Sequence, residues 1–423
     1  MRIEIVCTGD EVLSGKTVNS NFSHISRRLE EVGLSVVWGT TVGDDRERLL
    51  EAFRLAATRA DAVIVNGGLG PTVDDLSQEV AALAAGDTLA LRPEWLDWME
   101  QFYRRRNRPM PPNNRKQAML PTTAELIDNP VGTACGFALD IGKARFFFTP
   151  GVPREMRKML DEQIIPRLLA QSGMRNAFRL KRFHSFGVGE SRADEMLKGI
   201  EDLVPGGGVK LGFQAHYPEL ETKLVVRGTD EADVARKLTP LEAEVRRHLG
   251  NFILAEDDST LEKVINDALV ARDGSLSTAE MFTSGGIASR MASMPDAERL
   301  FRRGVGARAL GELREAVGLP VNGGANAITP DMAVEVARAL RERSHASHAL
   351  GVLIDLDDGT DRVDFGGTIC IGIVGPDTVS SRQARLIGGR DWVRLGAAEL
   401  GLDCLRRHLL GLPVEERIDF EKR

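Results

Sequence analysis

The N-terminal third of the chain alternates short apolar runs with longer amphipathic segments. The apolar runs at 2–7, 35–38 and 62–65 have the length and β-branched content typical of buried strands. Helical spacing follows each run, at 20–32, 46–59 and 76–85. Strands that alternate with helices predict an α/β fold with a parallel, doubly wound sheet.

The same pattern continues with a helix expected over 91–106 and a very apolar strand at 145–148. The proline-rich turn at 150–156 opens a further helix, since proline fits the first helical turn, where its missing N–H is no loss. We therefore expect one α/β domain over residues 1–170.

A change in composition near Ser172 marks the expected end of this domain. Residues 171–254 combine strand-like runs with a charged helix, which predicts a small α+β domain. Its segment Tyr217-Pro218-Glu219 fits either a loop that reaches the ligand of the first domain or a plain turn. A third, α/β domain is expected over 255–423.

The segment 66–75, Asn-Gly-Gly-Leu-Gly-Pro-Thr-Val-Asp-Asp, directly follows the strand at 62–65. Its glycines allow the backbone to approach a ligand and to point N–H groups at an anion. Asp74 and Asp75 could hold a divalent cation beside that anion. The segment therefore predicts a site for a polyphosphate or nucleotide.

Two more polar turns, Thr8–Glu11 and Gly43–Asp45, follow predicted strands. Ligands of doubly wound sheets bind beyond the carboxyl ends of the strands, where these turns would meet. Clustered carboxylates raise one another's pKa unless a cation compensates, and oxygen ligands favour Mg²⁺ or Mn²⁺. The expected metal ligands are Glu11, Asp44, Asp74 and Asp75.

Each of these residues also has an ordinary structural explanation. Aspartate is the usual former of turns and helix caps, and Lys116 could be a surface lysine. As a functional residue, Lys116 would neutralise a phosphate. We favour function for the set as a whole, because its members stand at consecutive strand ends.

Composition narrows the class of protein. The 55 basic and 62 acidic residues give a net charge of −7, and aromatic residues make up 5%, so we expect no nucleic-acid partner. Four widely spaced cysteines predict reduced, mostly buried thiols. Neither a signal peptide nor an apolar run near ~20 residues is evident, so we expect a cytoplasmic protein without a membrane partner.

Several blocks in order resemble the competence/damage-inducible CinA proteins. They cover most of residues 1–160 and are Thr8–Gly15 with Asn19 and Asn21, Val42–Asp44, Gly67–Asp75, Arg115–Ala118, Asn129–Gly136 and Pro150–Pro153. The same domain resembles the molybdopterin-binding domain of molybdenum-cofactor biosynthesis proteins.

The resemblance implies three domains. The first would be a metal-dependent pyrophosphatase acting on ADP-ribose with Mg²⁺, Mn²⁺ or Co²⁺. Its expected catalytic residues are Asp44, Asp75 and Lys116. The expected substrate-binding residues are Thr8, Gly9, Asn19, Asn21, Gly67, Gly68, Gly70, Thr72, Gly132 and Thr133. A homodimer is also implied.

The last domain of active family members is a nicotinamide-mononucleotide amidase with the sequence Ala-Glu-Ser-Cys-Thr-Gly-Gly. Here the run is Ala-Glu-Met-Phe-Thr-Ser-Gly-Gly from Ala279 to Gly286, with Met281 at the position of the presumed nucleophile. A thioether cannot form an acyl intermediate. The tyrosine and lysine of a second family segment are also lost, over 307–313. We expect a C-terminal domain that keeps its fold and has lost amidase activity.

Three hypotheses follow. The first is hydrolysis of the pyrophosphate bond of ADP-ribose or a related nucleotide by the N-terminal domain. The second is a non-catalytic regulatory protein that binds molybdopterin or a nucleotide. The third is a residual nicotinamide-nucleotide amidase.

Overall fold

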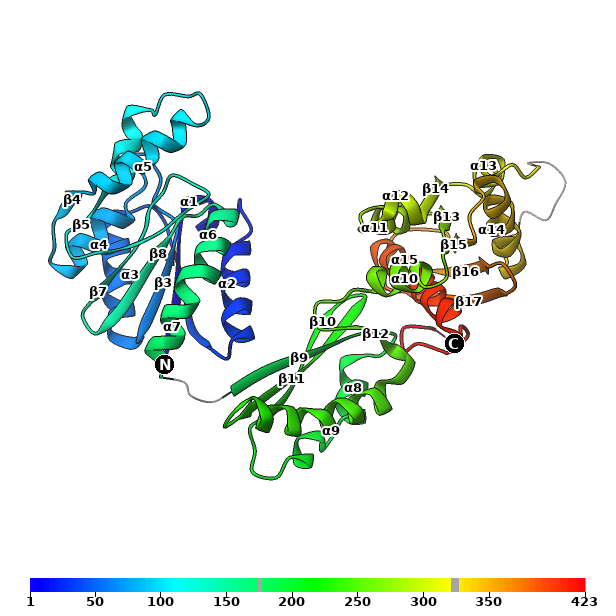
Figure 1. The fold of residues 1–423 in the computed structure, drawn as a ribbon. Coiled ribbons are helices and arrows are strands. Elements are labelled where there is room, and N and C mark those ends of the chain that lie inside the picture. The colour runs from blue at the N-terminus through cyan, green and yellow to red at the C-terminus, as the bar shows by residue number, and fades with distance from the viewer. Residues whose placement is uncertain (174–176, 321–326, 423) are drawn as a thin grey trace. The chain divides into compact units, whose positions relative to one another are not determined.

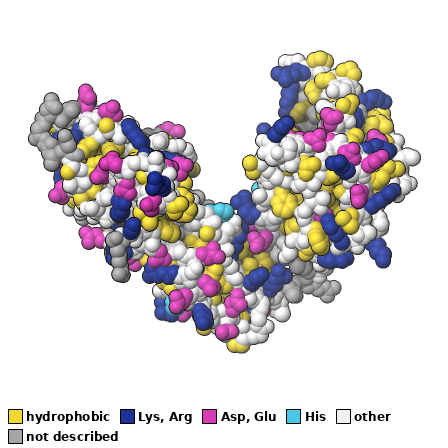
Figure 2. Space-filling model, turned by 180° about the vertical axis from the view of Figure 1, so that it is seen from behind, with side chains coloured by type: hydrophobic (Ala, Val, Ile, Leu, Met, Phe, Trp, Pro, Cys, Tyr) yellow, Lys and Arg dark blue, Asp and Glu magenta, His cyan; other side chains and the backbone are white. Residues whose placement is uncertain are grey.

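The structure is a computed structural model that describes residues 1–173, 177–320 and 327–422. It forms two compact units, Met1–Arg179 and Leu180–Arg423 (Figure 1). Acidic and basic side chains are interspersed on the face drawn in Figure 2. Within the described ranges, no helix has the length and apolar character needed to cross a bilayer.

The N-terminal unit is built on a six-stranded sheet with the order β2-β1-β3-β8-β7-β6. These strands are β1 (Ile3–Thr8), β2 (Val36–Val42), β3 (Ala62–Asn66), β6 (Glu125–Ile127), β7 (Gly136–Ile141) and β8 (Ala144–Thr149). Strands β2, β1, β3 and β8 are parallel, whereas β7 and β6 are antiparallel additions at one edge. The predicted α/β sheet is confirmed, and the antiparallel edge was not foreseen.

Helices cover both faces of this sheet, as a doubly wound fold requires (Figure 1). The helical segments are α1 (Asp10–Leu13), α2 (Ser20–Glu31), α3 (Arg46–Arg59), α4 (Ser77–Ala85), α5 (Pro93–Arg104), η1 (Pro112–Ala118), α6 (Pro153–Met159), η2 (Leu160–Ile164) and α7 (Ile165–Ser172). A separate two-stranded sheet pairs β4 (Leu89–Leu91) with β5 (Met119–Pro121).

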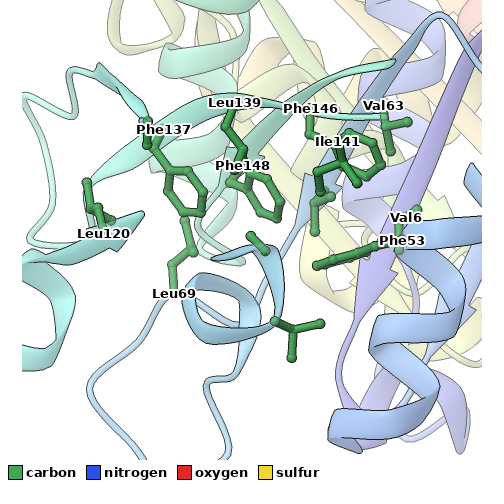
Figure 3. Packing of buried hydrophobic residues seen from close by; sticks show 14 of the residues in the cluster. Val6, Phe53, Val63, Leu69, Leu120, Phe137, Leu139, Ile141, Phe146 and Phe148 are labelled. Atoms are coloured by element: carbon green, nitrogen blue, oxygen red, sulfur yellow. The ribbon is translucent and has the colours of Figure 1, made fainter. Parts of the chain in front are cut away.

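Alternating side chains of the central strands enter two hydrophobic cores. Val6, Val63 and Phe148 pack with Phe53 of α3 in the core drawn in Figure 3. On the other face, Ile5 belongs to a core that also receives residues of α2, α6 and α7. Burial on both faces explains why these strands are apolar throughout.

The strand register brings the predicted turns together. Thr8 at the end of β1 pairs with Val42 at the end of β2, and Cys7 pairs with Asn66 at the end of β3. The three turns that follow therefore begin at the same edge of the sheet.

The C-terminal unit contains two sheets. The first has the order β10-β11-β9-β12, with β9 (Ala177–Phe186), β10 (Val209–His216), β11 (Glu219–Gly228) and β12 (Ile253–Glu256). Its helical segments are α8 (Glu190–Met196), η3 (Ile200–Leu203), α9 (Glu231–Leu249) and η4 (Gly250–Phe252). The tip of the β10–β11 hairpin is the segment Tyr217-Pro218-Glu219.

The second sheet has the order β14-β13-β15-β16-β17, with parallel pairing around β13 and antiparallel pairing beyond β15. Its strands are β13 (Leu276–Met281), β14 (Phe301–Ala307), β15 (His348–Leu356), β16 (Gly366–Val374) and β17 (Val379–Ile387). Its helices are α10 (Leu261–Val270), α11 (Gly286–Ala292), α12 (Ala297–Leu300), α13 (Leu310–Val317), α14 (Pro330–Ser344) and α15 (Arg390–Leu410). The predicted limits at 170/171 and 254/255 remain predictions.

The four cysteines, Cys7, Cys135, Cys370 and Cys404, are all buried and free, as their wide spacing predicted.

Candidate functional site

An acidic cavity of about 780 Å³ lies beyond the carboxyl ends of β1 and β2. Its lining residues are Asp10, Glu11, Leu13, Ser14, Lys16, Asp44 and Asp74. Three of the four predicted metal ligands are thus brought to one cavity. Asp75, the fourth, is not among the lining residues.

Two hydrogen bonds between Asp10 and Asp44 join the loops after β1 and β2. The N–H of Asp10 donates to Asp44 Oδ2 at 3.1 Å, and the N–H of Asp44 donates to Asp10 Oδ1 at 3.2 Å. A Cβ at position 43 would lie 2.3 Å from Asp10 Oδ1, so a side chain at this position would displace the Asp10 carboxylate.

The Asp44 carboxyl lies in an environment that disfavours its charge. Burial raises its pKa, the N–H of Asp10 lowers it, and the carboxylates of Asp10, Glu11 and Asp74 raise it further. Lys16 is the one cationic side chain in the lining of this cavity. An acidic set of this kind is complementary to a cation.

A metal ion is not preorganised in this cavity. Within residues 1–173, 177–320 and 327–422, no three His, Cys, Asp or Glu side chains are placed to hold one together. The donors that line the cavity are nevertheless the carboxylate oxygens that hard divalent cations prefer. The residues therefore fit such a cation in chemistry, and their side chains would have to converge on it.

Asp75 closes the glycine-rich turn. Its Oδ2 accepts hydrogen bonds from Thr72 N at 2.8 Å and Thr72 Oγ1 at 2.6 Å. A Cβ at Gly70 would lie 2.4 Å from the same oxygen. In this structure the carboxylate therefore supports the turn, and its predicted catalytic and metal-binding roles remain predictions.

Lys116 and its neighbour also bind this turn. Lys116 Nζ donates to the carbonyl oxygen of Thr72, and Gln117 Nε2 donates to the carbonyl oxygen of Leu69 at 3.1 Å. Two side chains of η1 thus hold the glycine-rich turn by its main-chain carbonyl groups. Lys116 reaches the predicted phosphate loop, as expected, but its contact there is with a main-chain oxygen.

The first two glycines of the turn allow close packing of strand ends. Gly67 and Gly68 have φ values of 112° and 69°, which side chains rarely adopt. A Cβ at Gly67 would lie 2.5 Å from Thr8 Oγ1. That buried hydroxyl has no hydrogen-bond partner among the described residues.

The predicted substrate-binding asparagines have structural contacts. Asn19 caps α2 by accepting from Phe22 N at 3.0 Å. Buried Asn21 donates to Asn66 Oδ1 at 2.9 Å and to the carbonyl oxygen of Gly151 at 2.7 Å. The contacts of Asn21 join α2 to the ends of β3 and β8, and neither asparagine lines the acidic cavity.

Gly132 and Thr133 lie in a loop held by Asn129 and by Trp95. Asn129 Oδ1 accepts from Gly132 N at 3.1 Å, and Trp95 Nε1 donates to the carbonyl oxygen of Thr133 at 3.1 Å. Asn129 Nδ2 also donates to Glu155 Oε2 at 2.7 Å. Burial raises the pKa of Glu155, a residue that was not among the predicted site residues.

Sequence reasoning also missed three polar residues of the acidic cavity, Asp10, Ser14 and Lys16. Asp10 belongs to the Thr8–Glu11 turn and could have been found from its position at a strand end. Gly9 precedes it with a φ of 137°, and a Cβ there would lie 2.8 Å from Glu11 Oε1. Ser14 and Lys16 follow the short helix α1, and no pattern in the sequence distinguishes them.

A second cavity, of about 380 Å³, lies in the C-terminal unit beside the segment that replaces the amidase motif. Its lining residues are Glu280, Phe282, Ser284, Gly285, Gly306, Ala307 and Arg308. Met281 is not among them, because its side chain packs into the hydrophobic core with Val305 and Leu313.

The polar groups of the second cavity are engaged in supporting its wall. Glu280 is buried and accepts from Thr283 Oγ1, from Ile287 N at 3.1 Å and from Ala288 N at 2.9 Å. The exposed Ser284 hydroxyl lies 3.5 Å from the carbonyl oxygen of Phe282, to which it donates. The described lining residues include no nucleophile hydrogen-bonded to a general base, which is the arrangement that acyl transfer requires.

Three family models match successive parts of the chain. Residues 4–170 match the family described as "Probable molybdopterin binding domain". Residues 180–255 match the "Damage-inducible protein CinA KH domain", and residues 258–409 match the "CinA C-terminal domain". A solved structure, the protein CinA from Thermoplasma acidophilum, is 32% identical and covers 40% of this chain and 96% of its own, with a TM-score of 0.36.

Full-length relatives match nearly the whole chain. A CinA-like protein of Geotalea uraniireducens is 34% identical over 423 residues, covering 99% of this chain and 100% of that protein. A CinA-like protein of Shewanella halifaxensis is 36% identical over 422 residues, covering 98% and 97%. A protein of Shewanella oneidensis named nicotinamide-nucleotide amidohydrolase PncC is 35% identical over 421 residues, covering 98% and 97%. The chain therefore belongs to the family of CinA-like proteins.

Proposed function

We propose that the N-terminal unit hydrolyses the pyrophosphate bond of ADP-ribose or a related nucleotide with the help of a divalent cation. The acidic cavity beyond β1 and β2, in which burial and then the neighbouring carboxylates raise the pKa of Asp44, is the observation that carries the proposal. Such a cavity favours a cation and, through it, a polyphosphate.

Glu11, Asp44 and Asp74 would hold Mg²⁺, Mn²⁺ or Co²⁺. When bound, the cation would polarise the phosphoryl group and lower the pKa of water. The main-chain N–H groups of the turn that begins at Gly67 would bind phosphate oxygens. Lys16 and Lys116 would offset the remaining negative charge.

Asp44 is also suited to accept the proton of the attacking water. Its Oδ2 accepts from Asp10 N, which leaves Oδ1 for the proton. A raised pKa makes a carboxylate a better base near neutral pH. Water would attack one phosphorus, the bridging P–O bond would break, and the products from ADP-ribose would be AMP and ribose 5-phosphate.

Incubation of the full chain with ADP-ribose and each metal in turn tests this function through the release of AMP. Asp44→Asn should abolish release, and Asp45→Asn is its matched control. Asp45 caps α3 by accepting from Arg48 N at 2.9 Å and does not line the cavity. Absence of AMP with every metal would contradict hydrolysis, and tight binding without turnover would instead support the non-catalytic binding protein.

The name of the Shewanella oneidensis relative makes amidohydrolysis of a nicotinamide nucleotide the second candidate. Against it stands the core position of Met281, which leaves the second cavity without the presumed nucleophile. Ammonia release from nicotinamide mononucleotide decides between the two. We expect none from the native chain. Activity only in Met281→Ser would identify a lost nucleophile, and activity in the native chain would overturn the assignment of a lost amidase.

A further inference from the structure

The tip of the β10–β11 hairpin is seated on α15 within the C-terminal unit. The ring of Tyr217 stacks on Trp392 with 3.7 Å between centroids, and its hydroxyl donates to the carbonyl oxygen of Trp392 at 3.0 Å. A Cβ at Gly396 would lie 2.3 Å from Tyr217 Oη. The hairpin tip therefore lies on the helix at a position without a side chain.

Glu399 stands almost one turn farther along α15 and receives Arg290 from α11. Arg290 Nη1 lies 2.6 Å from Glu399 Oε2, and the Nε of the same guanidinium donates to Glu262 of α10. The side chain of Glu399 is 1% exposed. One partly exposed guanidinium thus pairs with two carboxylates, of which Glu399 is the buried one.

The hairpin adds a third carboxylate to this cluster. Burial raises the pKa of Glu219, while the charges of His184 and Arg290 lower it and those of Glu262 and Glu221 raise it. The Nδ1 atom of His184, on β9, lies 3.9 Å from Glu219 Oε2.

The neighbouring Glu221 is already compensated by two cations, because Arg182 and Lys223 lie 3.7 and 3.4 Å from its Oε1. The cluster that faces the hairpin tip therefore contains three carboxylates, one guanidinium and one imidazole.

One oxygen of this cluster lacks a partner. Glu399 Oε1 is buried and has no hydrogen-bond donor among the described residues. A buried carboxylate with an unpaired oxygen is costly, and a proton on that oxygen removes the charge. Burial accordingly raises the pKa of Glu399 to about 7, although Arg290 acts in the opposite direction.

We propose that Glu399 takes up one proton when the hairpin tip seats on α15, so that seating of the hairpin is a proton-linked conformational step. In the open state, with the hairpin tip lifted from α15, Glu399 would be hydrated, and its pKa would return toward the ordinary value of 4.5. Between that value and 7 the seated state holds a proton that the open state releases. The seating equilibrium constant therefore falls about tenfold per pH unit in this window and levels off above it.

The proton-linked step reaches the second cavity through α11. Arg290 lies in this helix, and the first N–H groups of the same helix, at Ile287 and Ala288, are held by Glu280 of the cavity lining. A change in the charge that binds Arg290 would therefore act on the helix whose first turn is held by Glu280 of that cavity.

The experiment uses ¹⁹F NMR of the full chain labelled with 5-fluorotryptophan. The chain has four tryptophans, and Trp392 alone lies in the C-terminal unit, so Trp392→Phe assigns its signal. We expect this signal to change across the window from about pH 4.5 to 7 and the other three to stay in place. Glu399→Gln, which can still accept from Arg290, should leave the Trp392 signal independent of pH.

Two further variants distinguish a titrating Glu399 from other causes. Glu262→Gln leaves the guanidinium of Arg290 to Glu399 alone and should lower the midpoint. Asp391→Asn removes an exposed carboxylate beside Trp392 and should not move it. A Trp392 signal that is constant between about pH 5 and 8.5, or a Glu399→Gln protein that still titrates through His184, would overturn the proposal.

Discussion

Asp10 and Asp44 each donate a main-chain N–H to the carboxylate of the other, at 3.1 and 3.2 Å. This reciprocal pair fastens the loops after β1 and β2 to each other at the rim of the acidic cavity. Each carboxylate commits one oxygen to the pair and keeps the other for a ligand. The two main-chain N–H groups thus set the positions of the two carboxylates. These donors do not titrate themselves.

Replacement of Gly43 by alanine should displace the Asp10 carboxylate, which accepts a hydrogen bond from Asp44 N. The new Cβ would lie 2.3 Å from Asp10 Oδ1, closer than any real contact. We expect a loss of AMP release of at least about tenfold and a destabilisation of about 1–3 kcal/mol, typical of overpacking. Steady-state kinetics and urea unfolding measure the two effects. Gly212→Ala, where a Cβ meets no atom within 4 Å, should change neither, and equal losses in both variants would contradict the assignment.

The pH dependence of AMP release should follow the ionisation of Asp44. A base acts when it is deprotonated, so kcat/KM should rise with pH through the pKa of Asp44, which burial raises and a bound cation would lower. Asp10→Asn removes a neighbouring negative charge while the main-chain hydrogen bond persists. The acid limb of the profile should therefore move to lower pH. A limb that stays in place or moves upward would show that another group controls the rate.

Replacement of Asp75 should affect nucleotide affinity, whereas replacement of Asp44 should affect turnover. Asp75→Ala deprives Thr72 of the acceptor for its N–H and hydroxyl, so the glycine-rich turn loosens and nucleotide affinity should fall about tenfold or more. Asp44→Asn should reduce turnover and leave the affinity measured without metal in the same range. Calorimetric titration with ADP-ribose, together with kcat, separates these outcomes. Unchanged affinity in Asp75→Ala would contradict a structural role for this carboxylate.

The buried Glu4 should depend on Arg59 for its stability. Its carboxylate is fully buried and binds Arg59 Nη2 at 2.5 Å and Thr40 Oγ1 at 2.7 Å. Arg59→Ala should lower the free energy of unfolding by about 2 kcal/mol. This loss is smaller than is usual for a broken buried ion pair, because Arg59 is partly exposed. Urea unfolding measures this change.

A double replacement tests whether the pair itself or the uncompensated charge is responsible. Glu4→Leu with Arg59→Leu should recover most of the loss, because no unpaired charge remains buried. Arg2→Ala, which removes an exposed pair with Asp61, should leave unfolding unchanged. A double variant as unstable as Arg59→Ala would mean that the pair contributes more than compensation.

Hydrophobic periodicity predicted the central strands because they are buried on both faces. The strand expected at 35–38 continues to Val42 in the structure, through Gly39, Thr40 and Thr41. Its polar end is stabilised by long-range contacts, such as the hydrogen bond from Thr40 to Glu4, which local patterns do not contain. Strand β10 was missed for a related reason, since its partly exposed residues show no alternation.

The sequence was sufficient to predict which turns meet at the candidate site. It was not sufficient to predict the direction of each side chain in them. Strand ends placed Glu11, Asp44 and Asp74 at one cavity, as parallel topology implies. Asp75, next in the chain, turns away because Thr72 offers it two donors. Likewise the sequence identified Met281 as the departure from the amidase motif, whereas its position in the core follows from packing alone.

The four buried thiols have a practical consequence for experiments on this chain. Burial raises the pKa of every one of them, to about 11 for Cys370 and about 12 for Cys404. Thiolates are the species that react with alkylating probes, and these side chains form few of them at neutral pH. A single cysteine introduced on the surface would therefore react selectively, so spectroscopic labels can be attached without first removing the native cysteines.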